Sequence, residues 1–145
     1  MEDVSEIWRV YQTPEETADD SNKDFTVPVN TEWQILWIWV ELTTTNAVGN
    51  RQLVIEVLDA AGDIIGIVAV ASVTQAASLA RNYLFAPAVP DLLAFRDTDF
   101  LSTPIPPTLF LDAGQILRVR DNKAIAAAAD DMIVQLSFAA RAVIQ

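Results

Sequence analysis

Cysteine and histidine are both absent from this chain of 145 residues. Their absence excludes disulfide bonds, thiolate nucleophiles, zinc sites built from Cys and His, and every mechanism with an imidazole base. Only four glycines occur, and none is arranged in a phosphate-binding motif such as GxGxxG. We therefore expect no cofactor and no bound metal.

Basic residues are also scarce: nine Lys and Arg stand against twenty Asp and Glu, which gives a net charge of −11. A surface this acidic repels nucleic acid. The longest weakly charged apolar run, residues 64–80, is interrupted by polar residues and falls short of the ~20 residues that a membrane helix needs. The first residues lack the pattern of a secretory signal. The sequence thus predicts a protein made in the cytoplasm, with neither nucleic acid nor membrane as a partner.

Apolar residues, by contrast, make up 52% of the chain, enough to bury one core in a domain of this length. Short β-branched and aromatic runs alternate with turn signals, and no βαβ pattern appears. This pattern predicts an all-β fold: a single antiparallel β-sandwich of jelly-roll or Greek-key type. Strands are expected at residues 33–42, 51–59, 64–73, 78–85, 116–120 and 132–140, with 51–59 and 64–73 as a hairpin. The alanine-rich run 124–129 is expected to form one helical turn.

Acidic residues are concentrated at the front, where residues 1–24 hold eight of the twenty. A short β-prone island at residues 7–11 lies within this segment, and a polar stretch opened by Pro14 follows it. We interpret residues 1–24 as an acidic N-terminal arm or edge strand ahead of a β-sandwich domain at 25–145. A solvated leader that only aids solubility is the alternative.

Five of the seven prolines lie between residues 86 and 107, so this stretch is expected to lack regular central strands. Its apolar side chains favour a long ordered loop. The arm and this loop are the irregular segments that gain most from packing on a neighbouring subunit. The residues expected to contact another copy or a capsid are Ile7, Trp8, Val10, Tyr11, Leu92, Leu93, Phe95, Arg96 and Phe100.

Three tryptophans, Trp33, Trp37 and Trp39, are spaced by even numbers of residues within the run 33–42. Indoles on one face of a strand could form a stacking platform for sugars. Because both faces of this run are apolar, however, we expect a central strand covered on each side, with the tryptophans packed in the core.

Carboxylates are the only plausible acid and base groups, and they occur as Asp19-Asp20, Asp130-Asp131 and Asp97-x-Asp99. A glycosidase needs two carboxylates that face one sugar, and calcium could use the side chains of Asp97 and Asp99. Neighbouring acids in polar turns are ordinarily solvated. We therefore assign no catalytic residue and expect no enzyme activity.

Four runs carry a resemblance: FTVP at 25–28, LTTTNAVGNRQ at 42–52, FAP at 85–87 and FRDTDF at 95–100. They resemble a class of small virion proteins of tailed bacteriophages, over roughly residues 25–140. The resemblance implies a non-enzymatic β-sandwich subunit of the particle, assembled in the host cytoplasm. We expect a head decoration (cement) protein that binds the major capsid protein or another virion protein as a homo-oligomer, with a trimer favoured. A neck or tail component and a carbohydrate- or receptor-binding module are the alternatives.

Overall fold

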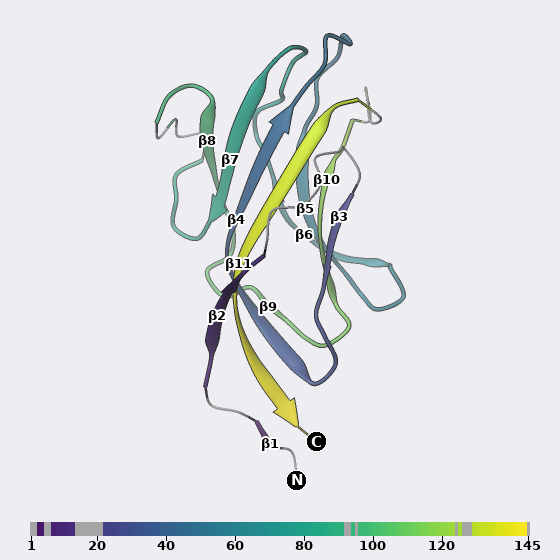
Figure 1. Ribbon diagram of the computed structural model, residues 1–145, viewed down its shortest axis with the longest axis vertical. Coiled ribbons are helices and arrows are strands. Elements are labelled where there is room, and N and C mark those ends of the chain that lie inside the picture. Colours follow the sequence, from purple (N-terminus) through teal and green to yellow (C-terminus); the bar gives the residue numbers. More distant parts are fainter. Residues whose placement is uncertain are drawn as a thin grey trace.

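The computed structural model describes residues 3–4, 7–13, 22–91, 94, 96–123, 125 and 129–144. The regular structure of these described residues is entirely β, with eleven strands in two sheets (Figure 1). The all-β class and the two-sheet arrangement predicted from the sequence are confirmed. Of the run 124–129, only Ile125 and Ala129 are described, so the expected helical turn lies outside the described residues.

The larger sheet has seven strands and is built around two long ones, β4 (Thr31–Thr43) and β11 (Asp131–Ile144), which pair antiparallel. Beyond β11 lie two short strands, β1 (Asp3–Val4) and β2 (Arg9–Gln12). Beyond β4 lie β7 (Ala80–Ala86) and β9 (Phe110–Leu111), and β8 (Phe100–Pro104) follows β7. Strands β2 and β8 therefore lie at opposite edges of one sheet.

The smaller sheet has four antiparallel strands in the order β3 (Lys23–Thr26), β10 (Ile116–Asp121), β5 (Leu53–Leu58) and β6 (Ile64–Val70). Strands β5 and β6 form the hairpin predicted from the sequence. Its turn contains Gly62 at a φ of +93°, which a residue with a side chain rarely adopts. Strand β3 starts before residue 25, so the domain boundary expected there falls inside a strand.

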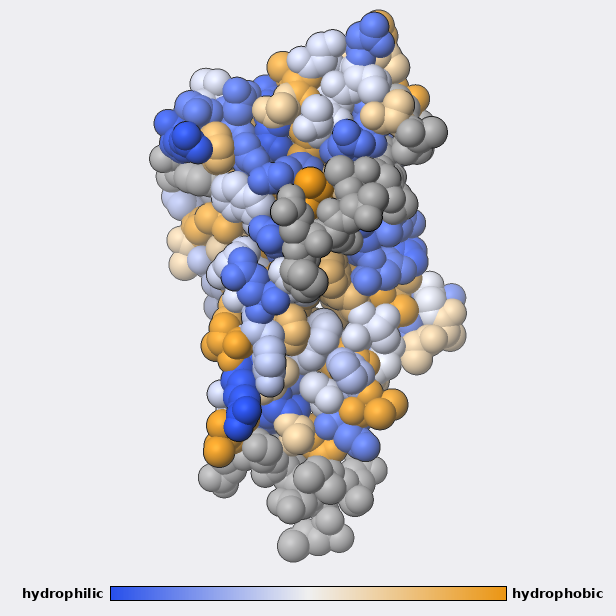
Figure 2. Space-filling model, viewed as in Figure 1, coloured by the Kyte–Doolittle hydropathy of each residue, from blue (hydrophilic) through white to orange (hydrophobic). Residues whose placement is uncertain are grey.

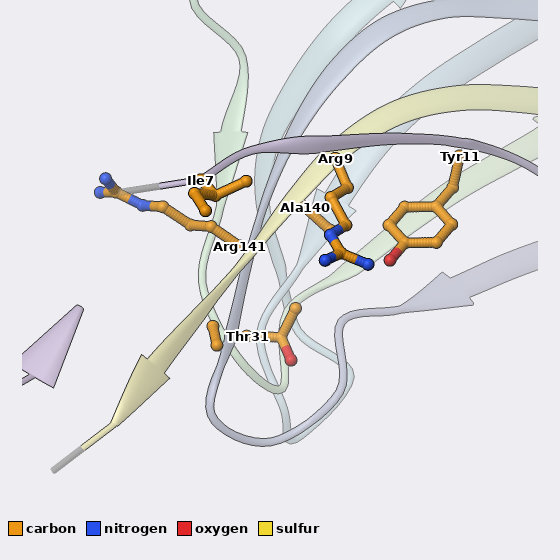
Figure 3. Close-up of a pocket in the computed structure, with 7 residues that line it drawn as sticks. Ile7, Arg9, Tyr11, Thr31, Ala140 and Arg141 are labelled. Carbon is orange, nitrogen blue, oxygen red and sulfur yellow. The ribbon is translucent and has the colours of Figure 1, made fainter. Parts of the chain in front are cut away.

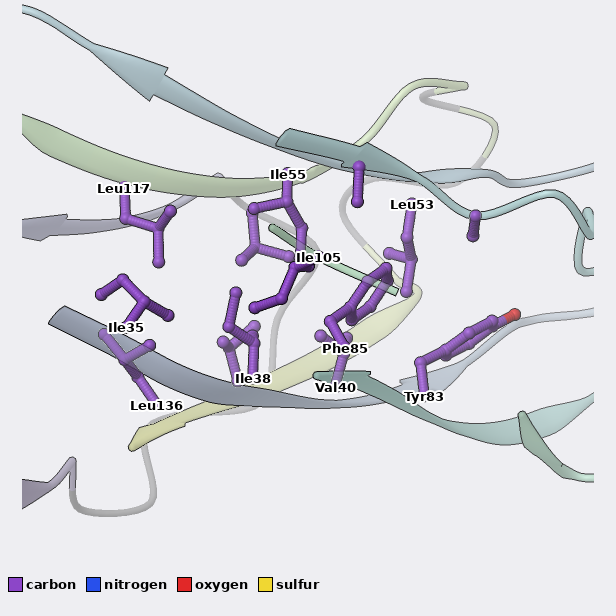
Figure 4. Close-up of a cluster of buried hydrophobic side chains, with 14 of the residues drawn as sticks. Ile35, Ile38, Val40, Leu53, Ile55, Tyr83, Phe85, Ile105, Leu117 and Leu136 are labelled. Carbon is purple, nitrogen blue, oxygen red and sulfur yellow. The ribbon is translucent and has the colours of Figure 1, made fainter. Parts of the chain in front are cut away.

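Alternating side chains of the two sheets form the core between them (Figure 4). Leu53 and Ile55 of β5 point toward β4, where Ile38 and Val40 point back, and each of these side chains is at most 1% exposed. Burying one such side chain contributes roughly 1.5 to 3 kcal/mol. In the predicted strand 132–140, every second residue from Met132 faces this core: Met132, Val134 and Leu136 lie in it and Phe138 packs against it.

The proline-rich stretch contains a strand that the sequence did not predict. Residues 100–104 form β8 where we expected a loop, and Pro104 is tolerated because an edge strand can leave the proline nitrogen outside the ladder. Strand β8 runs parallel to β7, so the expectation of a wholly antiparallel fold is also wrong.

The three tryptophans do not share a face of β4. The register between β4 and β11 shifts at Ser137 and Phe138, which face Trp37 and Ile35, so that Leu36 is an extra residue. Such a bulge reverses the alternation of side chains. Trp33 consequently faces the core at 7% exposure. Trp37 and Trp39 lie on the other face and are half-buried, so the expectation that they pack in the core is wrong.

Candidate functional site

A groove lies where β2 pairs with the C-terminal half of β11, beside the turn that joins β3 to β4 (Figure 3). It consists of two adjoining hollows of about 330 and 260 Å³, which share Tyr11, Thr31 and Ala140. We call it the β2 groove. The remaining lining residues are Ile7, Arg9, Arg141 and Ala142 in the first hollow, and Pro28, Trp33 and Phe138 in the second.

The pairing of three strands brings the groove residues together. Arg9 lies opposite Ala140, and Ala140 lies opposite Trp33, while Tyr11 lies opposite Phe138. Residues that face one another in a ladder, and those two positions along, point to the same side of the sheet. These five side chains therefore lie on the core-facing side of the larger sheet, at its end.

Three aromatic rings form the floor of the groove. The ring centres of Tyr11 and Phe138 are 5.7 Å apart with the planes stacked, and those of Phe138 and Trp33 are 4.2 Å apart. Tyr11 is 48% exposed whereas Trp33 is 7% exposed. The floor thus runs without a break from the core to open surface, and it offers an apolar ring face to a ligand.

Two arginines border this floor, and they differ in their pairing. Nε and Nη2 of Arg141 donate to Oε2 of Glu32 at 3.1 and 2.9 Å, and its guanidinium lies 4.6 Å from the centre of the Trp8 ring. The side chain of Arg9 makes no hydrogen bond or ion pair with any described residue, and in Figure 3 its guanidinium lies beside the Tyr11 side chain. Among the described residues, the Arg9 guanidinium therefore has no carboxylate partner, in a chain of net charge −11.

The titratable side chains of the described groove lining are Arg9, Tyr11 and Arg141. A guanidinium beside an aromatic ring recognises a carboxylate attached to an apolar group. The groove is therefore suited to a segment that combines an acidic and an apolar side chain.

The predicted contact residues that the structure describes are divided between the two edges of the larger sheet. Ile7 and Tyr11 line the groove. Trp8 and Val10 do not line it. The ring centres of Trp8 and Phe110 are 6.0 Å apart, and Val10 is 69% exposed. In Figure 2 apolar and hydrophilic surface alternate along the lower left flank of the molecule, where β2 lies in Figure 1.

The other predicted contacts that the structure describes lie at the opposite edge of that sheet. Phe100 begins β8, and the guanidinium of Arg96 lies 4.7 Å from the centre of its ring. Leu92, Leu93 and Phe95 lie outside the described residues. The structure therefore does not bring the two predicted segments together into one surface.

The groove members that sequence reasoning missed include Arg9, Thr31, Ala140 and Phe138. Arg9 alternates with Ile7 and Tyr11, and this two-residue spacing was the available signal for a shared face. The others come from β4 and β11, and only the register of the ladder places them beside β2.

Asp97 and Asp130, two of the carboxylates considered for calcium binding or catalysis, have structural partners. Oδ1 of Asp97 accepts a hydrogen bond from the backbone N–H of Asp99 at 2.9 Å, and Asp130 is buried against Arg51. The pair Asp19-Asp20 lies outside the described residues. Among the residues that the structure describes, no group of three or more acidic, His or Cys side chains is placed to hold a metal ion.

The described part of the chain includes no helix long and apolar enough to cross a membrane.

No protein-family model matches this chain, and no curated protein is significantly similar to it.

Proposed function

We propose that this chain is a non-enzymatic structural subunit of a larger assembly, and that the β2 groove holds a segment of a neighbouring protein. The observation that carries the proposal is the aromatic floor of Tyr11, Phe138 and Trp33 beside the unmatched guanidinium of Arg9. Exposed aromatic and Arg side chains of this kind are the residue types that dominate the energetics of protein interfaces.

The expected occupant is an extended segment with one apolar side chain and one carboxylate. The apolar side chain packs on Tyr11 and Phe138, and the carboxylate pairs with Arg9. The strong negative charge of the free chain keeps unassembled subunits apart until this segment is available.

The assembly we propose is the virion of a tailed bacteriophage, with the chain acting as a head decoration protein bound to the major capsid protein or to another virion protein. The sequence resemblance supports this assignment, as does the two-sheet fold, whose connections we propose to be of jelly-roll or Greek-key type. The groove at β2 and the Arg96–Phe100 pair at β8 lie at opposite edges of one sheet. A subunit with two such surfaces can join two neighbours, and repetition over a symmetric lattice then multiplies weak contacts.

The virion assignment is tested by immunogold labelling and mass spectrometry of purified particles of the source phage. Labelled heads support the decoration role, whereas labelled necks or tails support the alternative position in the particle. If the chain is absent from the particles, the assignment is wrong.

The role of the groove is tested by co-sedimentation of purified protein with particles that lack it. Arg9→Glu and Tyr11→Ala are expected to lose most of the binding. Val10→Ser is the matched control, because Val10 lies on the same strand, outside the groove, and is exposed. Equal binding by Arg9→Glu, Tyr11→Ala and the control would remove the groove from the mechanism.

A carbohydrate- or receptor-binding module is the second candidate, and the position of Trp37 and Trp39 favours it. Both lie on the outer face of β4, half-buried, and Nε1 of Trp39 donates to Oε1 of Glu41 at 3.3 Å. A glycan that binds the wild-type chain but not Trp39→Ala, with folding unchanged, would favour this candidate over the structural subunit.

A further inference from the structure

Strand β6 leaves one edge of the smaller sheet open. It pairs with β5 on one side and, in the part of the chain that the structure describes, with no strand on the other. Such an edge carries a row of main-chain N–H and C=O groups with which another strand can pair.

Strand β6 also has more exposed apolar side chains than any other described strand. Ile64 is 54% exposed, Ile65 53%, Ile67 54% and Val70 42%, and no residue from 64 to 70 is charged. Natural edge strands are often protected by charged residues, by proline or by β-bulges; β6 has two register shifts in its pairing with β5, but no charged residue and no proline. Strand β8 follows that rule, since it ends in Pro104.

The register with β5 determines which side chains point outward. It shifts twice, so that Ile64, Ile67 and Val70 lie opposite Leu58, Glu56 and Val54. Between them, Gly66 and Ala69 lie opposite Val57 and Ile55, which face the core. The outward row of β6 therefore consists of every third residue, and all three of its side chains are apolar.

This row is complementary to itself. When a second β6 runs antiparallel to the first about a two-fold axis at Ile67, Ile64 faces Val70 of the partner subunit and Ile67 faces its own counterpart. Each of the three side chains of this row then has an apolar partner on the second copy.

We propose that β6 pairs with β6 of a second copy of this chain, which joins the two four-stranded sheets into one continuous sheet. Charge restricts where two copies can meet: at −11 per chain they repel over most of their surface, whereas β6 itself carries no charged residue, and its outward row is complementary to itself. A two-fold contact makes the unit a dimer, in place of the trimer favoured from the sequence. The proposal deepens the homo-oligomeric state given above, and it rests neither on the virion assignment nor on the β2 groove.

Introduced cysteines test this contact directly, because the chain has none of its own. Ile67→Cys is expected to form a disulfide-linked dimer under mild oxidation, since facing Cα atoms of antiparallel strands are about 4.5 to 5.5 Å apart. Ile64→Cys alone is expected not to cross-link. A mixture of the Ile64→Cys and Val70→Cys chains is expected to form a disulfide-linked dimer. Val48→Cys is the collision control, because Val48 is 93% exposed and lies outside β6.

Ile67→Lys tests the same contact without a covalent bond. It places two ammonium groups opposite each other, so the dissociation constant of the dimer should rise roughly tenfold or more. Sedimentation equilibrium measures this against the chain mass of 15.9 kDa, and circular dichroism checks folding. Arg9→Glu should remain dimeric, which separates a failure of this proposal from a failure of the groove.

Two results would overturn the β6 pairing. One is a wild-type chain that stays monomeric at all accessible concentrations. The other is an Ile67→Cys chain that cross-links no faster than Val48→Cys.

Discussion

Arg51 and Asp130 are separated by 79 residues in the sequence and form a fully buried ion pair: Nε of Arg51 donates to Oδ2 of Asp130 at 2.7 Å, and Nη2 donates to Oδ1 at 3.1 Å. The guanidinium also donates to the carbonyl oxygens of Ala47 and Gly49 at 2.9 and 2.8 Å. Asp130 accepts a further bond from the backbone N–H of Thr45 at 2.8 Å. The pair thus ties the connection between β4 and β5 to the start of β11.

Arg51→Met should destabilise the fold strongly. It removes the partner of a buried carboxylate, and such losses cost about 3 to 5 kcal/mol. The matched control is Arg118→Met, because Arg118 pairs with Asp24 on the surface at 2.7 Å, and exposed pairs contribute about 0 to 1 kcal/mol. Urea unfolding followed by tryptophan fluorescence measures both. Similar losses for the two variants would contradict the structural role of Arg51.

Acid should weaken the fold through Asp130. Burial alone would raise the pKa of this carboxyl, but the bonds from Arg51 and Thr45 outweigh it and hold the pKa below the ordinary value of 3.8. A carboxyl with a lowered pKa in the folded state stabilises the fold above its unfolded pKa, and this contribution disappears as the pH falls through the folded pKa. The free energy of unfolding should therefore drop below about pH 4, and Asp130→Asn should flatten that drop.

Asp121 provides a control of opposite sign. Burial raises its pKa above 3.8, against the bonds that it accepts from the backbone of Lys123 and Gln52. Its contribution is present at low pH and is lost as the pH rises through the raised pKa. Asp121→Asn should therefore gain stability relative to the wild type as the pH rises above about 4, whereas Asp130→Asn should lose it. Urea midpoints measured across this pH range distinguish the two.

Trp33→Ala should cost more stability than Trp37→Ala. Trp33 faces the core, with its ring centre 4.2 Å from that of Phe138, and removing a buried Trp side chain costs about 3 to 5 kcal/mol. Trp37 lies on the outer face and is half-buried, so its removal exposes less new apolar surface. Thermal unfolding compares the two variants. An equal loss would show that the outer face of β4 is covered as tightly as the core.

Gly49→Ala should destabilise the fold more than Gly62→Ala. Both glycines have a positive φ, +140° and +93°, so both substitutions introduce backbone strain. A Cβ at position 49 would also lie 2.7 Å from Cδ1 of Ile125, whereas a Cβ at position 62 meets no atom within 4 Å. Chemical denaturation measures the free energy of unfolding of both variants, and the difference between their losses reports the steric contact with Ile125. If Gly62→Ala is the more costly change, the close approach to Ile125 does not matter in solution.

Alternation of apolar residues predicted most of the sheet strands, because burial of one face imposes a two-residue period. The hairpin of β5 and β6 and the inward row of β11 were found in this way. The same reasoning failed on β4, where the extra residue Leu36 reverses the period, because nothing in the residue types marks the bulge. It also failed on β8, because a proline-rich stretch can still pair at a sheet edge.

The candidate site was predicted only in part, for a related reason. Ile7 and Tyr11 stood out as apolar anchors in an acidic segment, and both line the β2 groove. Phe138 and Trp33 look like ordinary strand residues in the sequence, and it is long-range strand pairing that places them beside Tyr11. Asp130 was read as one of two neighbouring solvated acids, because its partner Arg51 lies in a distant part of the chain.

The pairing of β1 with β11 determines how the protein would respond to a mechanical load. Asp3 and Ile144 are partners in this antiparallel pair, so a force that separates them acts at one end of the ladder. Such a load opens the hydrogen bonds one after another, and the first pairs that it meets beyond β1 are Ala142 with Thr31 of β4 and Ala140 with Arg9 of β2. All four of these residues line the β2 groove, so a pull at this end would open the groove before it reaches the buried pair of Leu136 and Ile38.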